Sequence, residues 1–349
     1  MTIQAGKKRR NQIIESAIPV IAVLLAFGGG AFLIALSGVS PIEAYQSMLR
    51  GAFGSKNNIA ETLVKATPLL LASLGIAVAF RTRVFNIGAE GQIYMGALGA
   101  AFVGLFLGDL PAIVGIPLAL LAGFIMGAVW AGIAGILKLR LQANEIIVTL
   151  MMNYIAIELT NYLISGPWKD PSSTEPFTAQ MAAGTQLPNL LSGTRLHVGF
   201  LVAILAVFIV RWIMRHTVFG YQLMVTGSNE KAAEYGGIKI NRIVMLAMLI
   251  SGGLAGLAGV SEVSGLHHRV LEGISPGYGY TAIAIALLGK EKPLGVLVAS
   301  ILFAALVVGA DGMHRSTGVP IAVVLIIEGL VLLFAMGSEF LKRRKVVSE

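Results

Sequence analysis

Long apolar runs, each about 20 residues long, recur along almost the whole of the 349-residue chain. A helix of that length crosses a hydrocarbon core about 30 Å thick, and in lipid every backbone polar group must be paired within the protein. The alternating strands of about ten residues that build a membrane β-barrel do not occur in the sequence. With 56% hydrophobic and 13% charged residues, the chain has too little charge to coat a soluble protein of this size. The sequence therefore predicts an all-α polytopic membrane protein.

The apolar runs predict ten crossings, with basic tails at 1–14 and 339–349 around a single membrane domain at 15–338. If the N-terminus is inside, 19 of the 26 Lys and Arg residues fall in inner segments, as the positive-inside rule favours. Both termini are therefore expected in the cytoplasm, and the net charge of +8 reflects topology rather than nucleic-acid binding. Crossings two to five begin outside and crossings seven to ten begin inside, which predicts an inverted repeat. The crossings lie near 15–36, 62–80, 86–107, 111–137, 144–165, 197–214, 243–265, 275–289, 293–310 and 319–338.

The eighth crossing is short, and it opens with the letters SPGYGY from Ser275. Proline and glycine at these positions predict extended or broken backbone before a helix starts near Tyr280. Broken backbone is tolerated at membrane depth where protein or a cavity covers it. In the seventh crossing, Gly252, Gly253, Gly256 and Gly259 form a strip of small residues, which predicts close helix packing.

The third crossing opens with three polar residues, Asn86, Glu90 and Gln92. Asn86 can cap the helix, which places Glu90 about 6 Å along it from the cytoplasmic end at 1.5 Å per residue. Two interpretations remain for Glu90. It is either a helix-start carboxylate bonded to a neighbouring helix, or a gate residue at the inner end of a transport path together with its polar neighbours.

The fifth crossing carries a polar face, with side chains spaced by about one helical turn. Hydrogen bonding between helices would explain one or two such residues, but five of them favour the lining of a substrate path. In the tenth crossing, Glu328 lies mid-span and needs a polar cavity or a partner subunit. The residues of the fifth crossing are Asn153, Tyr154, Glu158, Asn161 and Tyr162.

A cytoplasmic segment at 219–238 contains a short helix signal. Ser228 or Asn229 can cap this helix and Gly236 can end it, so we expect a two-turn helix that docks a cytoplasmic partner. On the outer side, the loop at 166–196 is longer than most connections, and we expect it to receive an extracellular partner. The residues assigned to docking are Ser228, Asn229, Glu230, Ala232, Ala233, Glu234 and Tyr235.

Several enzyme signatures are absent from the sequence. No GxxxxGK[ST] loop occurs, so the chain has no ATPase site of that type, and neither HExxH nor GxSxG is present. The absence of cysteine excludes thiolate metal sites. The chain is therefore expected to be neither an enzyme nor a metal-binding protein.

Three stretches carry a family resemblance: FNIGAEGQIYMGALGA from Phe85, VTGSNEKAAEYGGI from Val225, and AIALLGKEKPLGVLVASILFAALVVGAD from Ala284 with RSTGVP after it. With them the chain resembles the permease subunits of ABC importers in the branched-chain amino acid and simple-sugar group. The letters NIGAEGQ are similar to those of the nucleoside-importing branch. The resemblance covers nearly the whole chain.

The resemblance implies a permease subunit, in the inner membrane of a bacterium, that imports nucleosides. A partner ATPase carrying ATP and Mg would sit on residues 228–235, so the chain itself needs no cofactor. A second homologous permease and an extracellular substrate-binding lipoprotein would complete the transporter, and the fifth and tenth crossings would flank its path. The alternatives are an ABC permease for a simple sugar or another small polar solute, an ion-coupled secondary transporter that uses a membrane carboxylate as proton site, and an intramembrane enzyme.

Overall fold

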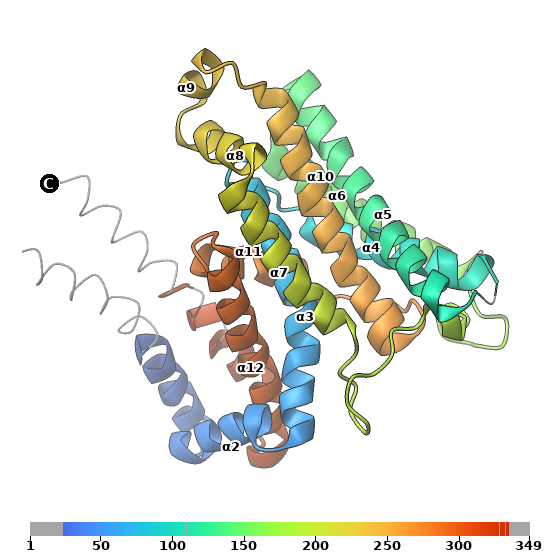
Figure 1. Ribbon diagram of the computed structural model, residues 1–349. Helices are drawn as coiled ribbons and strands as arrows, with labels where there is room; N and C mark the ends of the chain where they lie inside the picture. The colour runs from blue at the N-terminus through green and yellow to red at the C-terminus, as the bar shows by residue number, and fades with distance from the viewer. Residues whose placement is uncertain (1–23, 109, 328, 332, 335–349) are drawn as a thin grey trace, which may run out of the picture. The chain divides into compact units, whose positions relative to one another are not determined.

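The computed structural model describes residues 24–108, 110–327, 329–331 and 333–334 (Figure 1). Across these residues the secondary structure is helical, apart from isolated bridge pairs in the connecting loops. The helices are α2 (Pro41–Phe53), α3 (Lys56–Phe80), α4 (Ala89–Phe106), α5 (Ala112–Leu141), α6 (Glu145–Ser165), α7 (Gly199–His216), α8 (Val218–Ser228), α9 (Glu230–Tyr235), α10 (Ile240–Val260), α11 (Tyr278–Leu288) and α12 (Pro293–Thr317).

Six helices of the described part of the chain are long and apolar enough to cross a membrane, or seven if the bent pair Leu24–Leu36 and Pro41–Phe53 counts as one span. The six are α3, α5, α6, α7, α10 with its continuation, and α12. α4 is not among them, because Glu90 and Gln92 lower the hydropathy of its first turn. The prediction of an all-helical, multi-pass membrane protein is confirmed at this level.

Each predicted crossing from the second to the ninth coincides with a helix, namely α3 to α7 and α10 to α12. Two helices between the crossings were not predicted. α2 carries Glu43 and Arg50, and α8 has only 11 residues, so neither stands out as an apolar run of spanning length. The described residues of the first crossing form the helix Leu24–Leu36.

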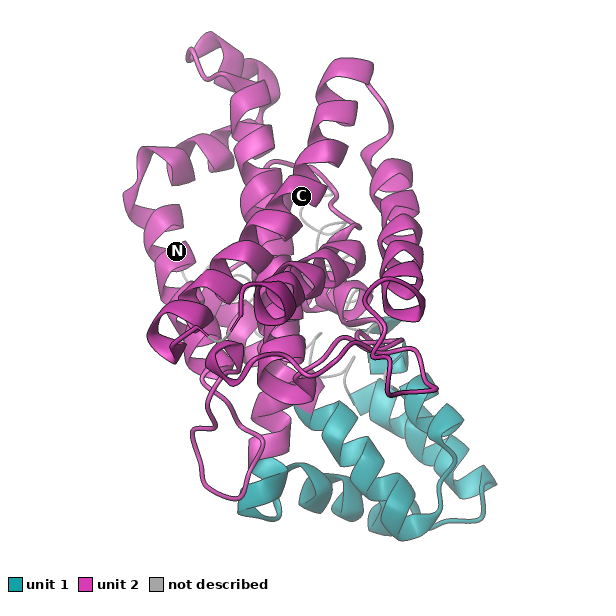
Figure 2. Cartoon of the chain, turned by 90° about the vertical axis from the view of Figure 1, so that its right-hand side faces the viewer, with its two compact units in different colours: residues 1–59, 305–349 teal, residues 60–304 magenta. Residues whose placement is uncertain are grey.

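The chain divides into two compact units, 1–59 with 305–349, and 60–304 (Figure 2). In the first unit, the helix Leu24–Leu36 bends by 115° into α2. α2 buries Ala44, Met48 and Ala52, which share one face. A side chain at Gly309 would meet the Met48 backbone, so α2 and the end of α12 approach closely at this point.

The second unit is held together by glycines at the contacts among α4, α5 and α10. A Cβ atom added at Gly96 would meet the backbone of Gly256, and one at Gly127 would meet the backbone of Gly252. One at Gly259 would meet the carbonyl of Ile93. The backbones of the three helices therefore approach too closely for any larger residue. The predicted packing role of the small residues in the seventh crossing is confirmed.

α10 continues as a π-helical turn, Ser261–His267, that receives the loop between α6 and α7. A π turn frees carbonyl groups from helical bonding. The Ser264 carbonyl accepts from the Leu187 N–H at 2.8 Å, and the His268 carbonyl accepts from the Met181 N–H at 2.9 Å. The loop is therefore fixed to the end of α10 by its own backbone.

Candidate functional site

The structural feature at the centre of the second unit is the start of α11. Residues 269–277 are not helical, and α11 begins at Tyr278, two residues before the expected start near Tyr280. Gly277 has φ +92°, a conformation that favours glycine. The Tyr278 N–H donates to Ser275 Oγ at 3.2 Å, and the Tyr278 hydroxyl accepts from Lys65 Nζ of α3 at 2.7 Å. The predicted break before the eighth crossing is confirmed.

The Glu90 side chain accepts a hydrogen bond from the backbone at the start of α11. Its Oε2 accepts from the Gly279 N–H at 2.7 Å, and the Glu90 residue is only 2% exposed. Glu90 itself lies in the first turn of α4, so its carboxylate is at the positive ends of two helix dipoles. A side chain at Gly279 would collide with the backbone of Glu90, which explains the glycine at this close contact.

The Glu90 contact and the charged residues that follow α11 lie at opposite ends of that helix. Gly279 is nine residues from Leu288, the last residue of α11, which corresponds to about 14 Å of helix at 1.5 Å per residue. Lys290 and Glu291 follow that end, and Glu291 pairs with Arg81 at 3.7 Å. The expected position of Glu90, about 6 Å from the cytoplasmic end of its own helix, stays a prediction.

Asn86 does not cap α4. The N-cap is Gly88, and the Asn86 amide is instead bonded to Gln92 through Nδ2–Oε1 and Oδ1–Nε2 pairs at 3.0 Å each. Asn86 Nδ2 also donates to Ser251 Oγ of α10 at 2.8 Å. These three side chains are at most 1% exposed, and each is satisfied by another. The predicted cap was wrong because α4 begins two residues later than expected, and Asn86 Oδ1 accepts from the N–H of the N-cap residue Gly88 at 3.0 Å.

Asn153 of α6 belongs to the same buried network. Its Oδ1 accepts from the Gly91 N–H at 2.8 Å, and its Nδ2 donates to the Ile87 carbonyl at 2.9 Å. Nδ2 also reaches the Tyr280 hydroxyl at 3.4 Å. One side chain therefore links the beginnings of α4 and α11, and Asn153 lies with Asn86, Glu90 and Gln92 rather than with the exposed residues of its own helix.

Three of the predicted path residues, Tyr154, Glu158 and Tyr162, lie on the exposed face of α6, and Asn161 is half-buried. Tyr154 and Tyr162 are 57% and 67% exposed, and Glu158 is exposed beside them. Asn161 Oδ1 is buried and has no hydrogen-bond partner among the described residues. Tyr280, 39% exposed, adjoins this face through its bond to Asn153. Sequence analysis did not single out Tyr280, although its place two residues into the helix after the break was a signal.

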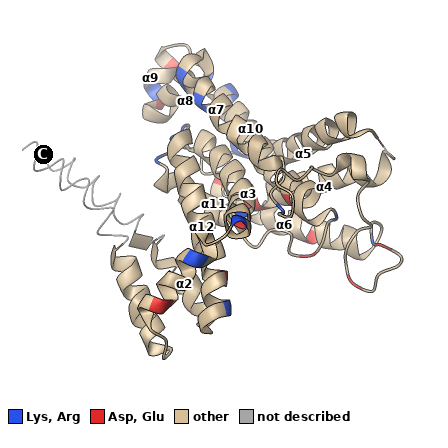
Figure 3. Ribbon diagram, turned by 60° about the horizontal axis from the view of Figure 1, so that its bottom comes forward, with Lys and Arg blue, Asp and Glu red and all other residues tan. Residues whose placement is uncertain are grey.

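The α8–α9 segment, Val218–Ser228 and Glu230–Tyr235, contains the residues predicted to dock a partner. Asn229 Oδ1 accepts from the Ala232 N–H at 3.1 Å, and the helix ends at Gly236, as predicted. Ala233 is buried and Tyr235 is 94% exposed. In Figure 3 the ribbon around α8 and α9 carries several positions of charged residues, blue and red, whereas most of the helical body is tan. The other predicted docking residues except Ala233 are exposed. Ser228 is the last residue of α8.

Glu328, the predicted path residue of the tenth crossing, lies outside the described residues.

These features define a class of protein: a polytopic helical membrane protein with a broken interior helix and an exposed helix between two spans. Residues 58–336 match the family described as "Branched-chain amino acid transport system / permease component". The chain belongs to this family.

Three relatives are similar over most of their length. The guanosine ABC transporter permease protein NupP of Bacillus subtilis is 38% identical, over 92% of this chain and 93% of NupP. The glucose ABC transporter permease protein TsgB13 of Haloferax volcanii is also 38% identical, over 94% and 89% of the two chains. The nucleoside ABC transporter permease protein NupB of Lactococcus lactis is 32% identical, over 93% and 91%.

The two asparagines of α6 allow a matched test of the buried network. Asn153→Leu leaves the Gly91 N–H and the Ile87 carbonyl without partners, so we expect the free energy of unfolding to fall by about 2–4 kcal/mol. Asn161→Leu removes an oxygen that has no partner among the described residues and should cost less than about 1 kcal/mol. Unfolding of the purified protein in mixed micelles with increasing SDS measures both, and equal losses would contradict the role of Asn153.

Proposed function

We propose that the chain is the transmembrane permease subunit of an ATP-driven ABC importer for nucleosides. The observation that carries the proposal is its similarity, over more than nine-tenths of its length, to permeases named for guanosine and nucleosides. The lack of a phosphate-binding loop agrees with a subunit that leaves ATP hydrolysis to a partner. A sugar is the second candidate substrate, because a glucose permease is equally similar.

For the topology, we propose ten crossings with both termini in the cytoplasm, a single permease domain at 15–338, and an inverted repeat of crossings two to five and seven to ten. The distribution of basic residues supports this arrangement. α8, α9 and Lys290 then lie on the cytoplasmic side, and the loop at 166–196 lies outside, where a substrate-binding lipoprotein would dock.

In this proposal, α9 is the element through which the ATPase subunits act on the permease. ATP binding would close two ATPase subunits against each other, and their movement would reach the membrane helices through residues 228–235. α9 suits this role because it is capped at both ends and presents Glu234 and Tyr235 to solvent, while Ala233 is buried. A short helix fixed in this way moves as a rigid body. ATP and Mg belong to the partner in this scheme.

The substrate path lies along the exposed face of α6. Tyr154, Glu158 and Asn161, joined by Tyr280, offer hydroxyl, carboxylate and amide groups, which suit a neutral solute with many hydrogen-bonding groups. A face of this kind on a membrane helix needs a cover, and we propose that a second homologous permease supplies it, with Glu328 of the tenth crossing beside the path. Asn86, Glu90 and Gln92 are buried and bonded, so we assign them a structural role rather than an inner gate: Glu90 holds the start of α11, and Asn86 with Gln92 joins the start of α4 to α10.

Uptake in cells that lack their own nucleoside importers tests the substrate. With the two permeases, the ATPase and the binding lipoprotein expressed together, we expect ATP-dependent uptake of radiolabelled guanosine that excess inosine inhibits and excess glucose does not. Glucose competition would favour the sugar importer instead. Uptake by this chain alone, driven by an ion gradient, would identify a secondary transporter and contradict the proposal.

The same assay tests the path. Replacing both Glu158 and Asn161 with alanine removes two hydrogen-bonding groups, so we expect the guanosine uptake rate to fall roughly fivefold or more at an unchanged protein level. Ile209→Ala, at an exposed position of α7, serves as the control and should leave the rate unchanged. Unchanged uptake in the double variant would exclude this face as the path.

The coupling role of α9 can be tested separately. Ala232→Trp combined with Glu234→Lys changes two exposed side chains without disturbing buried Ala233, so the permease should still fold. We expect copurification of the ATPase and ATP-driven uptake to fall at least tenfold (roughly 1.4 kcal/mol). The control is Glu43→Lys, a charge reversal at an exposed position of α2. Full ATPase binding and uptake in the α9 variant would show that the ATPase docks elsewhere.

A further inference from the structure

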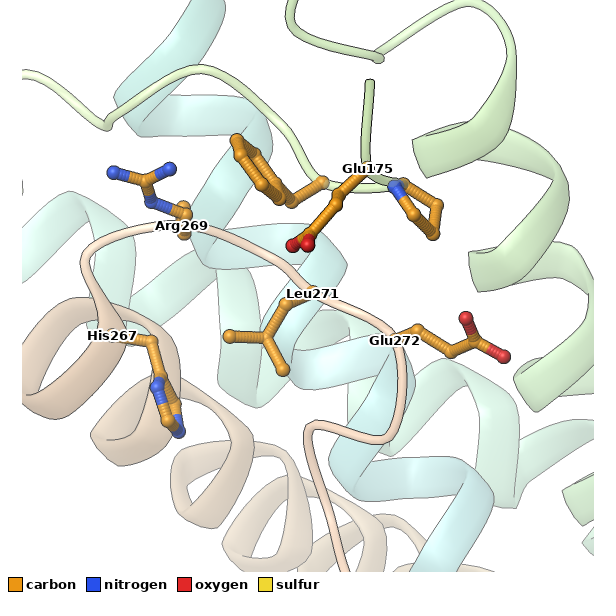
Figure 4. A pocket seen from close by; sticks show the side chains of 7 residues that line it. Glu175, His267, Arg269, Leu271 and Glu272 are labelled. Carbon is orange, nitrogen blue, oxygen red and sulfur yellow. The ribbon is translucent and has the colours of Figure 1, made fainter. Parts of the chain in front are cut away.

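A pocket of about 580 Å³ lies between the 166–196 loop and the segment that leads to α11. In Figure 4 the Glu175 carboxylate lies above Leu271, between Arg269 and Glu272. All of the lining residues belong to the second compact unit. They are Glu175, Pro176 and Phe177 of the loop, and His267, Arg269, Leu271 and Glu272 from the end of α10 and the segment after it.

The walls of the pocket are fixed by backbone hydrogen bonds. The Thr178 N–H donates to the Val270 carbonyl at 3.0 Å, and the Val270 N–H donates to Thr178 Oγ1 at 3.1 Å. The Phe177 carbonyl accepts from the Asp170 N–H at 2.9 Å. Two segments more than 90 residues apart in the chain are joined at this point. The pocket is therefore preformed, which lowers the entropic cost of binding a ligand.

Three charged side chains around the pocket form no close ion pair within the described part of the chain. Among the ion pairs of the described residues, none includes Glu175, Arg269 or Glu272. Arg269 instead places its guanidinium 4.7 Å from the ring centroid of Phe177. His267 pairs with the buried Glu262 at 3.6 Å. Two carboxylates and one guanidinium thus remain able to bond a ligand, next to the apolar surfaces of Leu271 and Pro176.

We propose that this pocket is a subsite for a ligand with neighbouring hydroxyl groups, the ribose of a nucleoside, on the outer side of the permease. An ionised carboxylate accepts hydrogen bonds, and each hydroxyl group of a sugar can donate one. Glu175 and Glu272 can therefore accept hydrogen bonds from the two neighbouring hydroxyl groups. The base contacts Leu271 and Pro176, and Arg269 bonds its acceptor atoms. The pocket combines apolar walls with a few polar groups, as small-molecule sites do. The proposal rests on the proposed nucleoside function and orientation.

The pocket lies on the segment that leads to the start of α11, next to the proposed substrate path. Leu271 and Glu272 lie in the same non-helical segment that ends at Gly277, where α11 begins. Glu90 holds the other end of that segment through Gly279. A solute released at the outer side would thus bind first at the loop and then pass Tyr280 on the face of α6. The subsite would receive the nucleoside before it enters the path.

Binding of inosine to the purified transporter complex in nanodiscs, without the binding lipoprotein, tests the proposal by equilibrium dialysis. Glu175→Gln combined with Glu272→Gln should weaken inosine binding about tenfold, because charge-assisted bonds to the diol become neutral ones. The analogue 2′,3′-dideoxyinosine should bind the wild type weakly and the variant equally weakly. Glu43→Gln is the same substitution at an exposed carboxylate of α2 that does not line the pocket, and this variant should bind inosine like the wild type.

Three results would overturn the subsite: no inosine binding by the wild type, equal inosine affinity in the double variant, or equal affinity for the dideoxy analogue. If glucose binds with the same dependence on Glu175 and Glu272 and inosine does not, the diol belongs to a free sugar and the nucleoside assignment is wrong. ATP-driven guanosine uptake is measured in parallel. Uptake without a pocket effect overturns the subsite alone, whereas the absence of nucleoside uptake overturns the proposed function.

Discussion

The hydrogen bond between the Glu90 carboxylate and the Gly279 N–H is the contact on which the second unit depends. α11 begins inside the protein, where its first N–H groups cannot reach bulk water, and an unpaired polar group at such a place costs several kcal/mol. Glu90 supplies an acceptor and also a negative charge at the positive ends of α4 and α11. Asn153 then fixes both helix starts to α6. A carboxylate that is costly in lipid is stabilised here by two helix ends.

The short helix α9 and the break before α11 could be predicted because their causes are local in the sequence. Asn229 and Gly236 cap a helix wherever it lies, and Pro276 with Gly277 interrupts one. The helices at the second to ninth predicted crossings could be predicted because length and hydropathy determine apolar helices of this kind. The partner of Glu90 could not be found in this way, since Gly279 is 189 residues away and nothing in the sequence specifies their distance. Asn153 was assigned to the path for the same reason: its position on the helix was known, but its contacts were not.

The polar residues of the membrane helices thus divide into two groups with different physical roles. Asn86, Glu90, Gln92 and Asn153 are buried and satisfied by each other or by the backbone, as a rigid support requires. Tyr154, Glu158 and Tyr162 of α6 are exposed, as a surface that meets a partner or a solute requires. The glycine contacts of α4, α5 and α10 make the support compact. The proposed transport cycle needs both groups: the buried residues keep the helices rigid, and the exposed residues form the polar face that moves with them.

Hydrogen–deuterium exchange of residues 277–281 in the purified permease tests the role of Glu90 most directly. The account predicts that Glu90→Ala speeds exchange at the start of α11 more than tenfold, since a charge-assisted bond is lost, and that Glu90→Gln, which keeps an acceptor, has a smaller effect. Glu291→Gln, which weakens only the pair with Arg81 beyond the other end of α11, is the control and should leave these amides unchanged. Unchanged exchange in Glu90→Ala would contradict the account.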